Sequence, residues 1–246
     1  MYYYMKLLAA CGIYFIICSL TVFTVQAQLS FLLFADAGSN QVSDGWYTRS
    51  IAAGSYNTGL YAVAGGVQFK LQGNSNALNG AFVNAGRQLV IREYPVQAKA
   101  FFAAHRFSEL MYETNWGVMA ETSYKQFDVK AGTSFRRYAF TKSAVEAYDI
   151  SEEGSQLREN FNMVYRAGYS LNPYDHSWNI RAFVTNLDHI VINQETNPIL
   201  GVSGFYRISD SFSLLLEARY LSAGAFNLSV NPFGYVFRTG IRWESR

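Results

Sequence analysis

The chain has 246 residues, with 20 Lys and Arg against 18 Asp and Glu and a formal net charge of +2. So small an excess of positive charge gives no reason to expect a nucleic acid partner. The two cysteines, Cys11 and Cys18, both lie in the first 27 residues. The remainder of the chain therefore has no disulfide, no thiolate metal site and no cysteine nucleophile.

Residues 1–27 are predicted to be a signal peptide. Lys6 precedes an apolar run over residues 7–25, and Val25-Gln26-Ala27 places small residues where a signal peptidase cleaves. We expect two parts, a cleaved signal peptide at 1–27 and one folded unit at 28–246 that begins with Gln28. The alternative is an uncleaved anchor helix, because the apolar run is long enough to cross a bilayer.

Twelve segments after the signal peptide have the pattern of β-strands, and the last six alternate best. They are about 29–36, 46–53, 58–71, 79–93, 95–107, 112–124, 126–138, 160–172, 177–187, 198–208, 211–221 and 232–244. No later apolar run reaches the length of a membrane helix, and only helices and closed barrels satisfy their backbone groups in lipid. We therefore predict an all-β fold, an antiparallel transmembrane β-barrel of twelve strands. The first two segments are weak, so ten strands is the alternative count, and a periplasmic sandwich or lipocalin-like barrel is the soluble alternative.

The segment 233–243 shows the alternation of a bilayer-crossing strand most clearly. One face carries Phe233, Tyr235, Phe237, Thr239, Ile241 and Trp243, and the other carries Gly234, Val236, Arg238, Gly240 and Arg242. Its length and its aromatic ends are typical of a strand that spans a membrane. The segment resembles the closing strand of Gram-negative outer-membrane β-barrels, which commonly ends in an aromatic residue, although residues 244–246 follow here. The resemblance implies the bacterial outer membrane, with its lipid as a partner.

The connections alternate between short turns and longer loops, as in bacterial barrels with periplasmic turns and outer loops. The predicted periplasmic turns are 54–57, 93–95, 124–126, 172–175 and 208–211. The predicted outer loops are 36–45, 72–79, 107–111, 139–159, 188–197 and 222–231. The longest, 139–159, carries five acids and either folds back onto a cationic lumen as a partial plug or is solvated.

Catalytic residues are sought first among the histidines, which are His105, His176 and His189. Asp188 and His189 lie at the root of an outer loop, but adjacent residues on a strand point to opposite faces and cannot easily cooperate. The sequence has no Gly-rich phosphate loop and no metal-ligand spacing. We therefore expect no enzyme activity, no cofactor and no metal.

Cationic side chains predominate on the predicted lumen face. The cations are Lys70, Lys99, Lys130, Arg136, Arg166, Arg181, Arg207, Arg219, Arg238 and Arg242, and the acids are Glu113, Glu121, Asp128 and Glu217. We predict that these cations, together with Glu217, line a pore, because rings of cationic side chains favour anions. The alternative is a closed interior, in which arginines satisfy carboxylates and carbonyls.

One hairpin gives a specific prediction about this lining. If Pro173 and Tyr174 form a two-residue turn, Arg166 faces Arg181 across the ladder. Like charges directly opposite are destabilising, so a lumen acid such as Glu217, water or an anionic solute should lie between them. We expect both arginines to contribute to anion selectivity, and their replacement by glutamate to shift the preference toward cations.

Three hypotheses for the function follow. The first is a narrow, monomeric outer-membrane channel for small anionic or sugar-like solutes. The chain resembles the small twelve-stranded oligosaccharide porins in length and basic lumen, without a motif that matches residue by residue. The second is a non-transporting barrel that acts as an envelope scaffold or as an accessory of a secretion or uptake assembly, with other envelope proteins as partners. The third is a hydrolase at the barrel rim.

Overall fold

The computed structural model describes residues 27–40, 45–71, 78–106, 110–151, 154–175, 177–222 and 234–245. The predicted signal peptide lies outside these residues apart from Ala27, so its cleavage stays a prediction. Among the described residues, no helix has both the length and the apolar character to cross a membrane.

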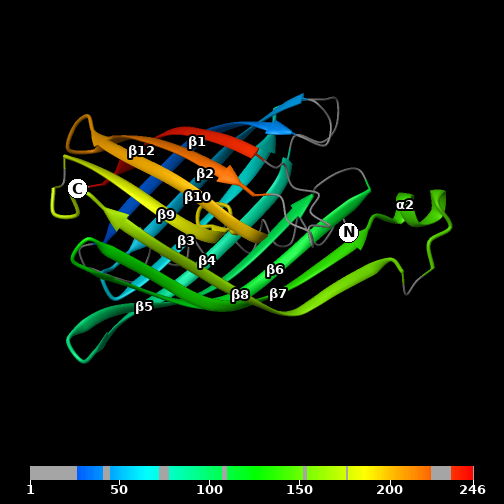
Figure 1. Cartoon of the computed structure of the whole chain (residues 1–246), viewed down its shortest axis with the longest axis horizontal. Helices are drawn as coiled ribbons and strands as arrows, with labels where there is room; N and C mark the ends of the chain where they lie inside the picture. Colours follow the sequence, from blue (N-terminus) through cyan, green and yellow to red (C-terminus); the bar gives the residue numbers. More distant parts are fainter. Residues whose placement is uncertain are drawn as a thin grey trace.

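The chain forms a closed barrel of twelve antiparallel strands, in which each strand pairs with its neighbours in sequence and β1 closes against β12 (Figure 1). The strands are β1 (Gln28–Asn40), β2 (Gly45–Asn57), β3 (Tyr61–Lys70), β4 (Leu78–Ile91), β5 (Tyr94–Arg106), β6 (Met111–Tyr124), β7 (Phe127–Phe140), β8 (Gln156–Ser170), β9 (Trp178–Asp188), β10 (Asn193–Arg207), β11 (Phe212–Leu221) and β12 (Gly234–Glu244). The predicted count of twelve is confirmed and the alternative of ten is wrong. The two strands with the weakest pattern, β1 and β2, have 13 residues each.

The strands alternate between a polar interior and an apolar exterior. On β12, Tyr235, Phe237 and Ile241 are half exposed or more on the outside, while Arg238 is buried inside. The same alternation on the other strands leaves a belt of exposed apolar side chains around the barrel. Such a belt is buried only in lipid, and all backbone groups of a closed barrel can pair between strands. The predicted faces of the closing strand are therefore confirmed for residues 234–243, while Phe233 lies outside the described residues.

The junction of β1 and β12 is closed by a backbone ladder and by two hydrogen bonds beyond the end of β12. The ladder runs from Ser30 opposite Glu244 to Gly38 opposite Val236. Past the strand end, the Ser245 N–H donates to the Leu29 carbonyl at 2.7 Å, and the Leu29 N–H donates to Ser245 Oγ at 2.8 Å. The residues that follow the terminal aromatic thus extend the closure.

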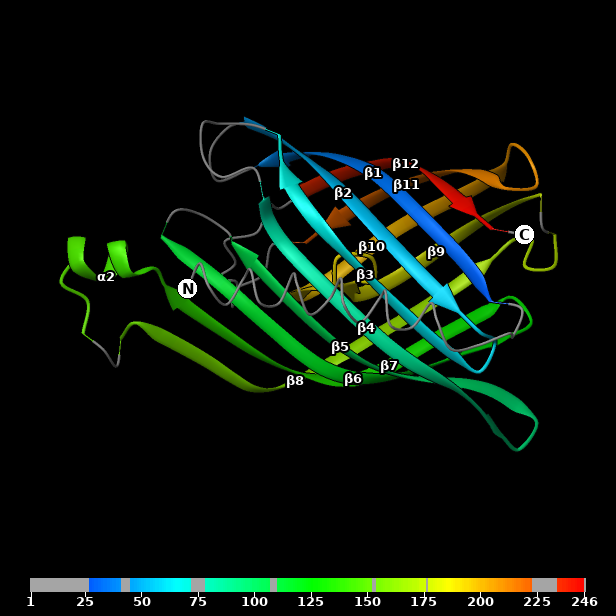
Figure 2. The same cartoon turned by 180° about the vertical axis from the view of Figure 1, so that it is seen from behind.

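The short turns gather at the end of the barrel that carries the C-terminus, and the connection between β7 and β8 extends from the other end (Figure 2). Four of the five predicted periplasmic turns lie within about two residues of their place. The fifth, expected at 54–57, is wrong, because β2 continues to Asn57 and the reversal falls at 58–60. There the Thr58 hydroxyl accepts from the Tyr61 N–H at 3.0 Å, and Asn57 Oδ1 accepts from the Gly59 N–H at 2.8 Å. These side-chain contacts place the turn later than the glycine of the sequence pattern suggests.

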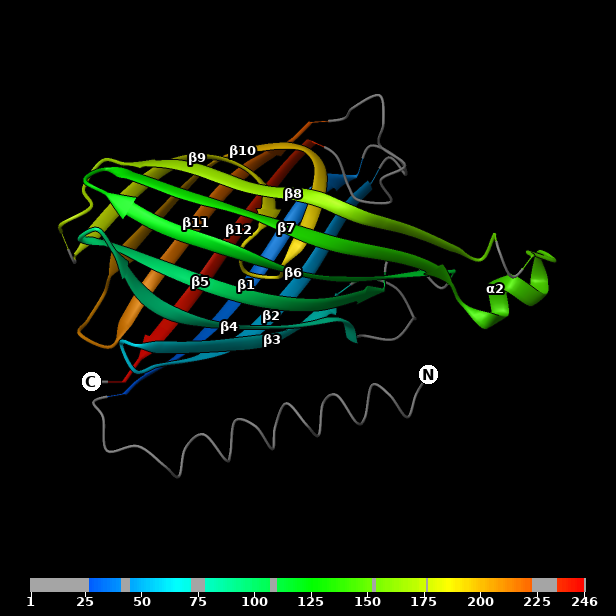
Figure 3. The same ribbon diagram turned by 90° about the horizontal axis from the view of Figure 1, so that it is seen from below.

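The longest connection, between β7 and β8, extends away from the barrel mouth and carries a short helix, α2 (Lys142–Ala147) (Figure 3). The Thr141 hydroxyl caps this helix by accepting from the Ala144 N–H at 3.3 Å. The helix stands beyond the barrel rather than in it, so it does not form a plug. The segment in the barrel interior is another connection, the one between β9 and β10.

Candidate functional site: the barrel interior and its inward turn

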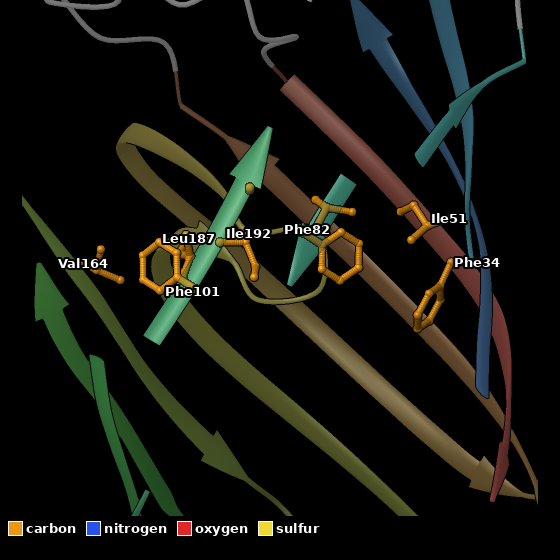
Figure 4. Packing of buried hydrophobic residues seen from close by; sticks show 9 residues of the cluster. Phe34, Ile51, Phe82, Phe101, Val164, Leu187 and Ile192 are labelled. Carbon is orange, nitrogen blue, oxygen red and sulfur yellow. The ribbon is translucent and has the colours of Figure 1, made fainter. Parts of the chain in front are cut away.

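The connection between β9 and β10, expected as an outer loop over 188–197, folds into the barrel (Figure 4). Its turn, residues 189–192, is held by Asp188, whose Oδ1 accepts from the Ile190 N–H at 3.0 Å and the Val191 N–H at 3.3 Å. The Asp188 carbonyl accepts from the Ile192 N–H at 2.7 Å. The sequence Ile190-Val191-Ile192 would expose apolar surface in an outer loop, and the inward fold buries it. We define residues 186–194 as the inward turn.

The inward turn packs in an apolar cluster that extends across the lumen. The members are Phe34, Ile51, Phe82, Phe101, Ala103, Val164, Leu187, Val191 and Ile192, from β1, β2, β4, β5, β8, β9 and the turn (Figure 4). Glycines on neighbouring strands give the rings room: a Cβ on Gly240 would lie 2.2 Å from the Phe34 ring, and one on Gly117 would lie 2.8 Å from the Phe101 ring. Interiors of transmembrane barrels are usually polar, so this apolar cluster departs from the usual pattern.

An ionic network ties the inward turn to the strands across the lumen. Arg238 binds Asp36 through Nε at 2.6 Å and Asp188 through Nη2 at 2.8 Å. Arg219 Nη1 lies 2.6 Å from Asp188, and Arg49 Nε lies 2.8 Å from Asp36. Because Asp36 and Asp188 are almost fully buried, the guanidinium groups of the network take the place of water in stabilising their charge, and at Asp188 the Ile190 and Val191 amides contribute as well. We call these five residues the central network.

The predicted register of the β8–β9 hairpin is wrong. Arg166 lies opposite Thr185, and Arg181 lies opposite Ser170, so the two arginines do not face each other. The connection is longer than two residues: Asp175 Oδ1 accepts from the Ser177 N–H at 2.6 Å, and the Leu171 N–H donates to the Ile180 carbonyl at 2.9 Å. The hydrogen bond from the Ser177 backbone lowers the pKa of the Asp175 carboxyl, which lies outside the membrane-spanning strands.

The two arginines nevertheless share one carboxylate. Asp128 on β7 lies 3.5 Å from Arg166 Nε and 3.2 Å from Arg181 Nε. The expected partner, Glu217, instead lies 3.1 Å from Arg219 Nε. Arg166 Nη1 also contacts His189 Nδ1 at 2.8 Å, which connects this group to the inward turn. A lumen acid therefore separates the two positive charges, although it is a different acid from the one expected.

Two further groups complete the charged interior. Glu121 bridges Lys99 at 2.5 Å and Lys130 at 2.6 Å. Arg136 Nη2 lies 2.7 Å from Glu159, and its Nη1 donates to the Gln194 carbonyl at 2.8 Å. The Arg136 contact with Gln194 is a second tie between the strands and the inward turn.

All eleven predicted pore-lining residues lie on the interior side of their strands, but at different depths. Arg136, Arg166, Arg219, Arg238 and Glu217 are buried, while Lys99, Lys130, Arg181 and Arg242 are partly exposed. Lys70 and Arg207 are exposed near the two ends of the barrel. Arg242 lies 3.4 Å from Glu244 at the periplasmic rim. Their role in lining a pore stays a prediction.

The sequence pattern missed at least five charged interior residues, which are Asp36, Arg49, Glu159, Asp188 and Glu195. The four acids were assigned to outer loops, because the strands that carry them are longer than their patterns indicate. Among the described residues, they raise the interior acids from four to at least eight, while Arg49 raises the cations from ten to eleven. The interior keeps a cationic excess, but a smaller one than predicted.

The histidines do not assemble a catalytic group in the described part of the chain. Asp188 contacts arginines of β11 and β12, while His189 contacts Arg166 of β8. His105 is buried on β5, and His176 lies outside the described residues. No group of three or more His, Cys, Asp or Glu side chains in the described ranges could hold a metal ion.

Near the outer mouth, a small set of buried polar side chains makes no hydrogen bond within the described structure. Both carboxylate oxygens of Glu113, both amide atoms of Asn115 and Nε2 of His105 belong to it. His105 and Glu113 lie directly opposite on β5 and β6, and Asn115 follows Glu113 on the same face. Buried polar groups without partners are rare in proteins, so these groups are suited to bind a polar molecule in the lumen.

No protein-family model matches the chain, and no curated protein sequence matches it. Among solved structures, the chain is similar to the KdgM porin, with a TM-score of 0.51 and 8% identity over 88% of this chain and 99% of that chain. It is equally similar to the NanC porin, with a TM-score of 0.51 and 12% identity over 87% of this chain and 98% of that chain. At these identities the likeness concerns the fold. The chain thus has the closed antiparallel barrel fold of these two porins.

Proposed function

We propose that the protein is a narrow outer-membrane channel for small anionic or sugar-like solutes, and that the inward turn is its gate. The observation that carries the proposal is the position of Asp188. This carboxylate is attached to the turn and is held by Arg49, Arg219 and Arg238, at 3.6, 2.6 and 2.8 Å. It occupies a place between guanidinium groups where the carboxylate or sulfate group of a solute could bind equally well.

Movement of the inward turn would remove the Asp188 carboxylate from the three arginines and let an anionic solute take its place. When Asp188 leaves, Arg49, Arg219 and Arg238 keep Asp36 and Glu217 as acidic neighbours, so three positive charges face two negative ones. An anionic solute that enters then restores the balance. Glu113, which lies 4.0 Å from Arg136 Nε, and Asn115 make no side-chain hydrogen bond in the described structure, so they can accept from and donate to hydroxyl groups, which supports a sugar-like solute.

The test is a planar-bilayer recording of the full protein and of Asp188→Asn. Asparagine keeps an oxygen that accepts from the Ile190 and Val191 amides but removes the charge that binds the arginines. We expect longer open times and a reversal potential, under a salt gradient, that shifts further toward anion preference. Asp175→Asn, in a periplasmic turn, is the matched control and should behave as the native protein. An Asp188→Asn protein that opens no more often than the native one contradicts the proposal.

Asp128 changes how the arginine pair should be tested. Glutamate at 166 and 181 would place three carboxylates together, so Arg166→Gln/Arg181→Gln is the better variant. We expect this double variant to lose part of the anion preference while it still conducts. An unchanged reversal potential would remove these two residues from the selectivity of the channel.

The apolar cluster favours a second candidate, the non-transporting barrel that acts as an envelope scaffold. Phe34, Phe82, Phe101 and Ile192 meet in the lumen, and a permanently packed layer would block an aqueous path. In that case neither the native protein nor Asp188→Asn would conduct, although both would insert. The same recordings therefore separate the two candidates.

A further inference from the structure

On the half of β8 that is nearer the outer mouth, the backbone pairing that forms the barrel wall is interrupted. The ladder with β9 joins residues 166–170 to residues 181–185 and ends there. On its other side, β8 pairs with β7 as far as Gln156 opposite Ala139. Within the chain segments that the structure describes, no strand pairs with residues 156–165 on the side away from β7. The reason is that β9 leaves the wall at Asn186 to enter the inward turn, and β10 resumes pairing at Ile199, opposite Thr185.

Part of this unpaired edge lies in the hydrocarbon region. Phe161 is 75% exposed and Met163 is 61% exposed on the outer face. Met163 lies opposite Thr133 of β7, on the membrane side of the stacked rings of Trp116 and Phe135, whose centroids are 4.3 Å apart. Aromatic girdles mark the membrane interface, so the backbone of residues 163–165 has to find partners without water.

Side chains replace the missing strand at this edge. Asn186 Oδ1 accepts from the Tyr165 N–H at 2.9 Å, and Asn186 Nδ2 donates to the Met163 carbonyl at 2.7 Å. Thr185 Oγ1 donates to the Tyr165 carbonyl at 2.7 Å, and Gln194 Nε2 donates to the Met163 carbonyl at 3.2 Å. We call this contact line the seam. Unlike a ladder, it can open while β7–β8 and β9–β10 stay paired.

Apolar surfaces lie on both sides of the seam. Inside, Val164 and Leu187 flank it and belong to the apolar cluster of the lumen. Outside, a groove of about 630 Å³ runs over the lipid face of β8–β11, and Ala167, Val184 and Leu200 are among the residues that line it. Ala167 is the next outward-facing residue after Tyr165, and Val184 directly precedes Thr185. The groove thus begins where the seam ends.

We propose that the seam is a lateral portal, through which a small apolar molecule passes between the apolar cluster of the lumen and the hydrocarbon of the membrane. A charged solute gains nothing from this route, since both surfaces that it joins are apolar. An apolar molecule exchanges one apolar environment for another and has to displace a few side-chain hydrogen bonds. The route is distinct from the axial channel, because it needs neither the central network nor an open mouth.

The test uses the full protein in lipid vesicles with an apolar diazirine dissolved in the lipid and glutathione outside to consume reagent in water. After photolysis, labelled residues are located by mass spectrometry. We expect label on Leu187, Val191 and Ile192 in the lumen, in addition to label on the lipid-facing residue Phe237. Asn186→Ala removes two of the seam's hydrogen bonds, and we expect it to raise lumen labelling about fivefold to a hundredfold, the range for loss of two hydrogen bonds.

Asn172→Ala is the matched control, since Asn172 hydrogen-bonds within the opposite connection of the same two strands, to Asp175 at 2.9 Å. It should label as the native protein does. Phe237 labelling verifies insertion in every variant, and Gln194→Ala replaces Asn186→Ala if the latter does not insert. Label confined to lipid-facing residues, including the groove, would mean that lipid rests on the wall without entry and would overturn the portal. Equal lumen labelling in the native protein and the seam variant would also overturn it.

Discussion

The barrel wall is built in two ways, and the contrast between β12 and β8 explains the interior. At β12, the backbone is paired on both sides along nearly the whole strand, with Arg238 inside and aromatic side chains outside. At β8, the outer half is paired on one side and capped by side chains on the other. The inward turn lies in the lumen and therefore does not pair with the outer half of β8.

The two regions depend on each other through charge. The inward turn leaves the wall beside β8, but Asp188 binds Arg219 of β11 and Arg238 of β12. The arginines of β11 and β12, where the wall is fully paired, therefore bind the inward turn, which leaves the wall beside β8. Removal of one partner of a buried ion pair is costly because it leaves an uncompensated charge, so loss of Arg219 or Arg238 should destabilise the inward turn. The comparison predicts large effects at β12 and smaller, local ones at β8.

The largest effect is expected for Arg238→Ala. This change leaves Asp36 and Asp188 buried with one cationic partner fewer, at a cost of about 3–5 kcal/mol in the free energy of unfolding. Arg242→Ala is the matched control: Arg242 lies on the same face of the same strand, is partly exposed and lies 3.4 Å from Glu244. It should cost about 0–1 kcal/mol. Urea titration in lipid vesicles, followed by tryptophan fluorescence, measures both. Equal costs would mean that the central network adds little to stability.

A smaller loss is expected on the lipid face of the same strand. Phe237→Arg places a cation in hydrocarbon and should cost about 2–4 kcal/mol near the midplane. Tyr235→Arg is the control, because Tyr235 is nearer the strand end and packs beside Tyr220, with ring centroids 5.1 Å apart, as in an interfacial girdle. Its cost should fall to about 0–1 kcal/mol. The same urea titration applies, and a larger cost at 235 than at 237 would move the membrane boundary.

These two strands also show what the sequence can and cannot predict. The faces of β12 follow from alternation of Phe237, Arg238 and Ile241, because the period of a strand is fixed by its backbone. The register of β8 against β9 does not, because it depends on hydrogen bonds of Asp175 within the connection. An assumed two-residue turn therefore misplaced Arg166 against Arg181.

The inward turn could not be predicted from the sequence, for a different reason. Asp188 in an apolar stretch fits the root of an outer loop, and its arginine partners lie on strands 31 and 50 residues further along the chain. The apolar triplet at 190–192 was the available signal, since a solvated loop rarely carries three large apolar residues in succession. Ten of the interior cations were placed on the lumen face from strand alternation, whereas Arg49 was not.

A local effect is expected at the seam. Hydrogen exchange of the Tyr165 amide should be about tenfold faster in Asn186→Ala than in the native protein, which corresponds to loss of one hydrogen bond. The amide of Phe237, in a strand that is paired on both sides, should not change. Mass spectrometry after exchange in lipid vesicles separates the two peptides. Faster exchange in both would indicate a general loss of stability rather than an opening at β8.

The smallest effect is expected at the β7–β8 connection, which leads into β8 but lies outside the membrane-spanning wall. Helix α2 stands beyond the barrel mouth, and Lys142 and Glu146 are exposed. Protease added to intact cells should therefore cleave between residues 141 and 155, because exposed segments outside a paired sheet are the usual sites of cleavage. Thr141→Ala removes the cap of the helix, worth about 0.5–2 kcal/mol of helix stability, and should speed the cleavage. The cleaved barrel should unfold at the urea concentration of the intact one, since the ladder from Phe127 to Phe140 remains paired with β6. Resistance to protease, or a barrel weakened by cleavage, would mean that the connection folds back onto the mouth.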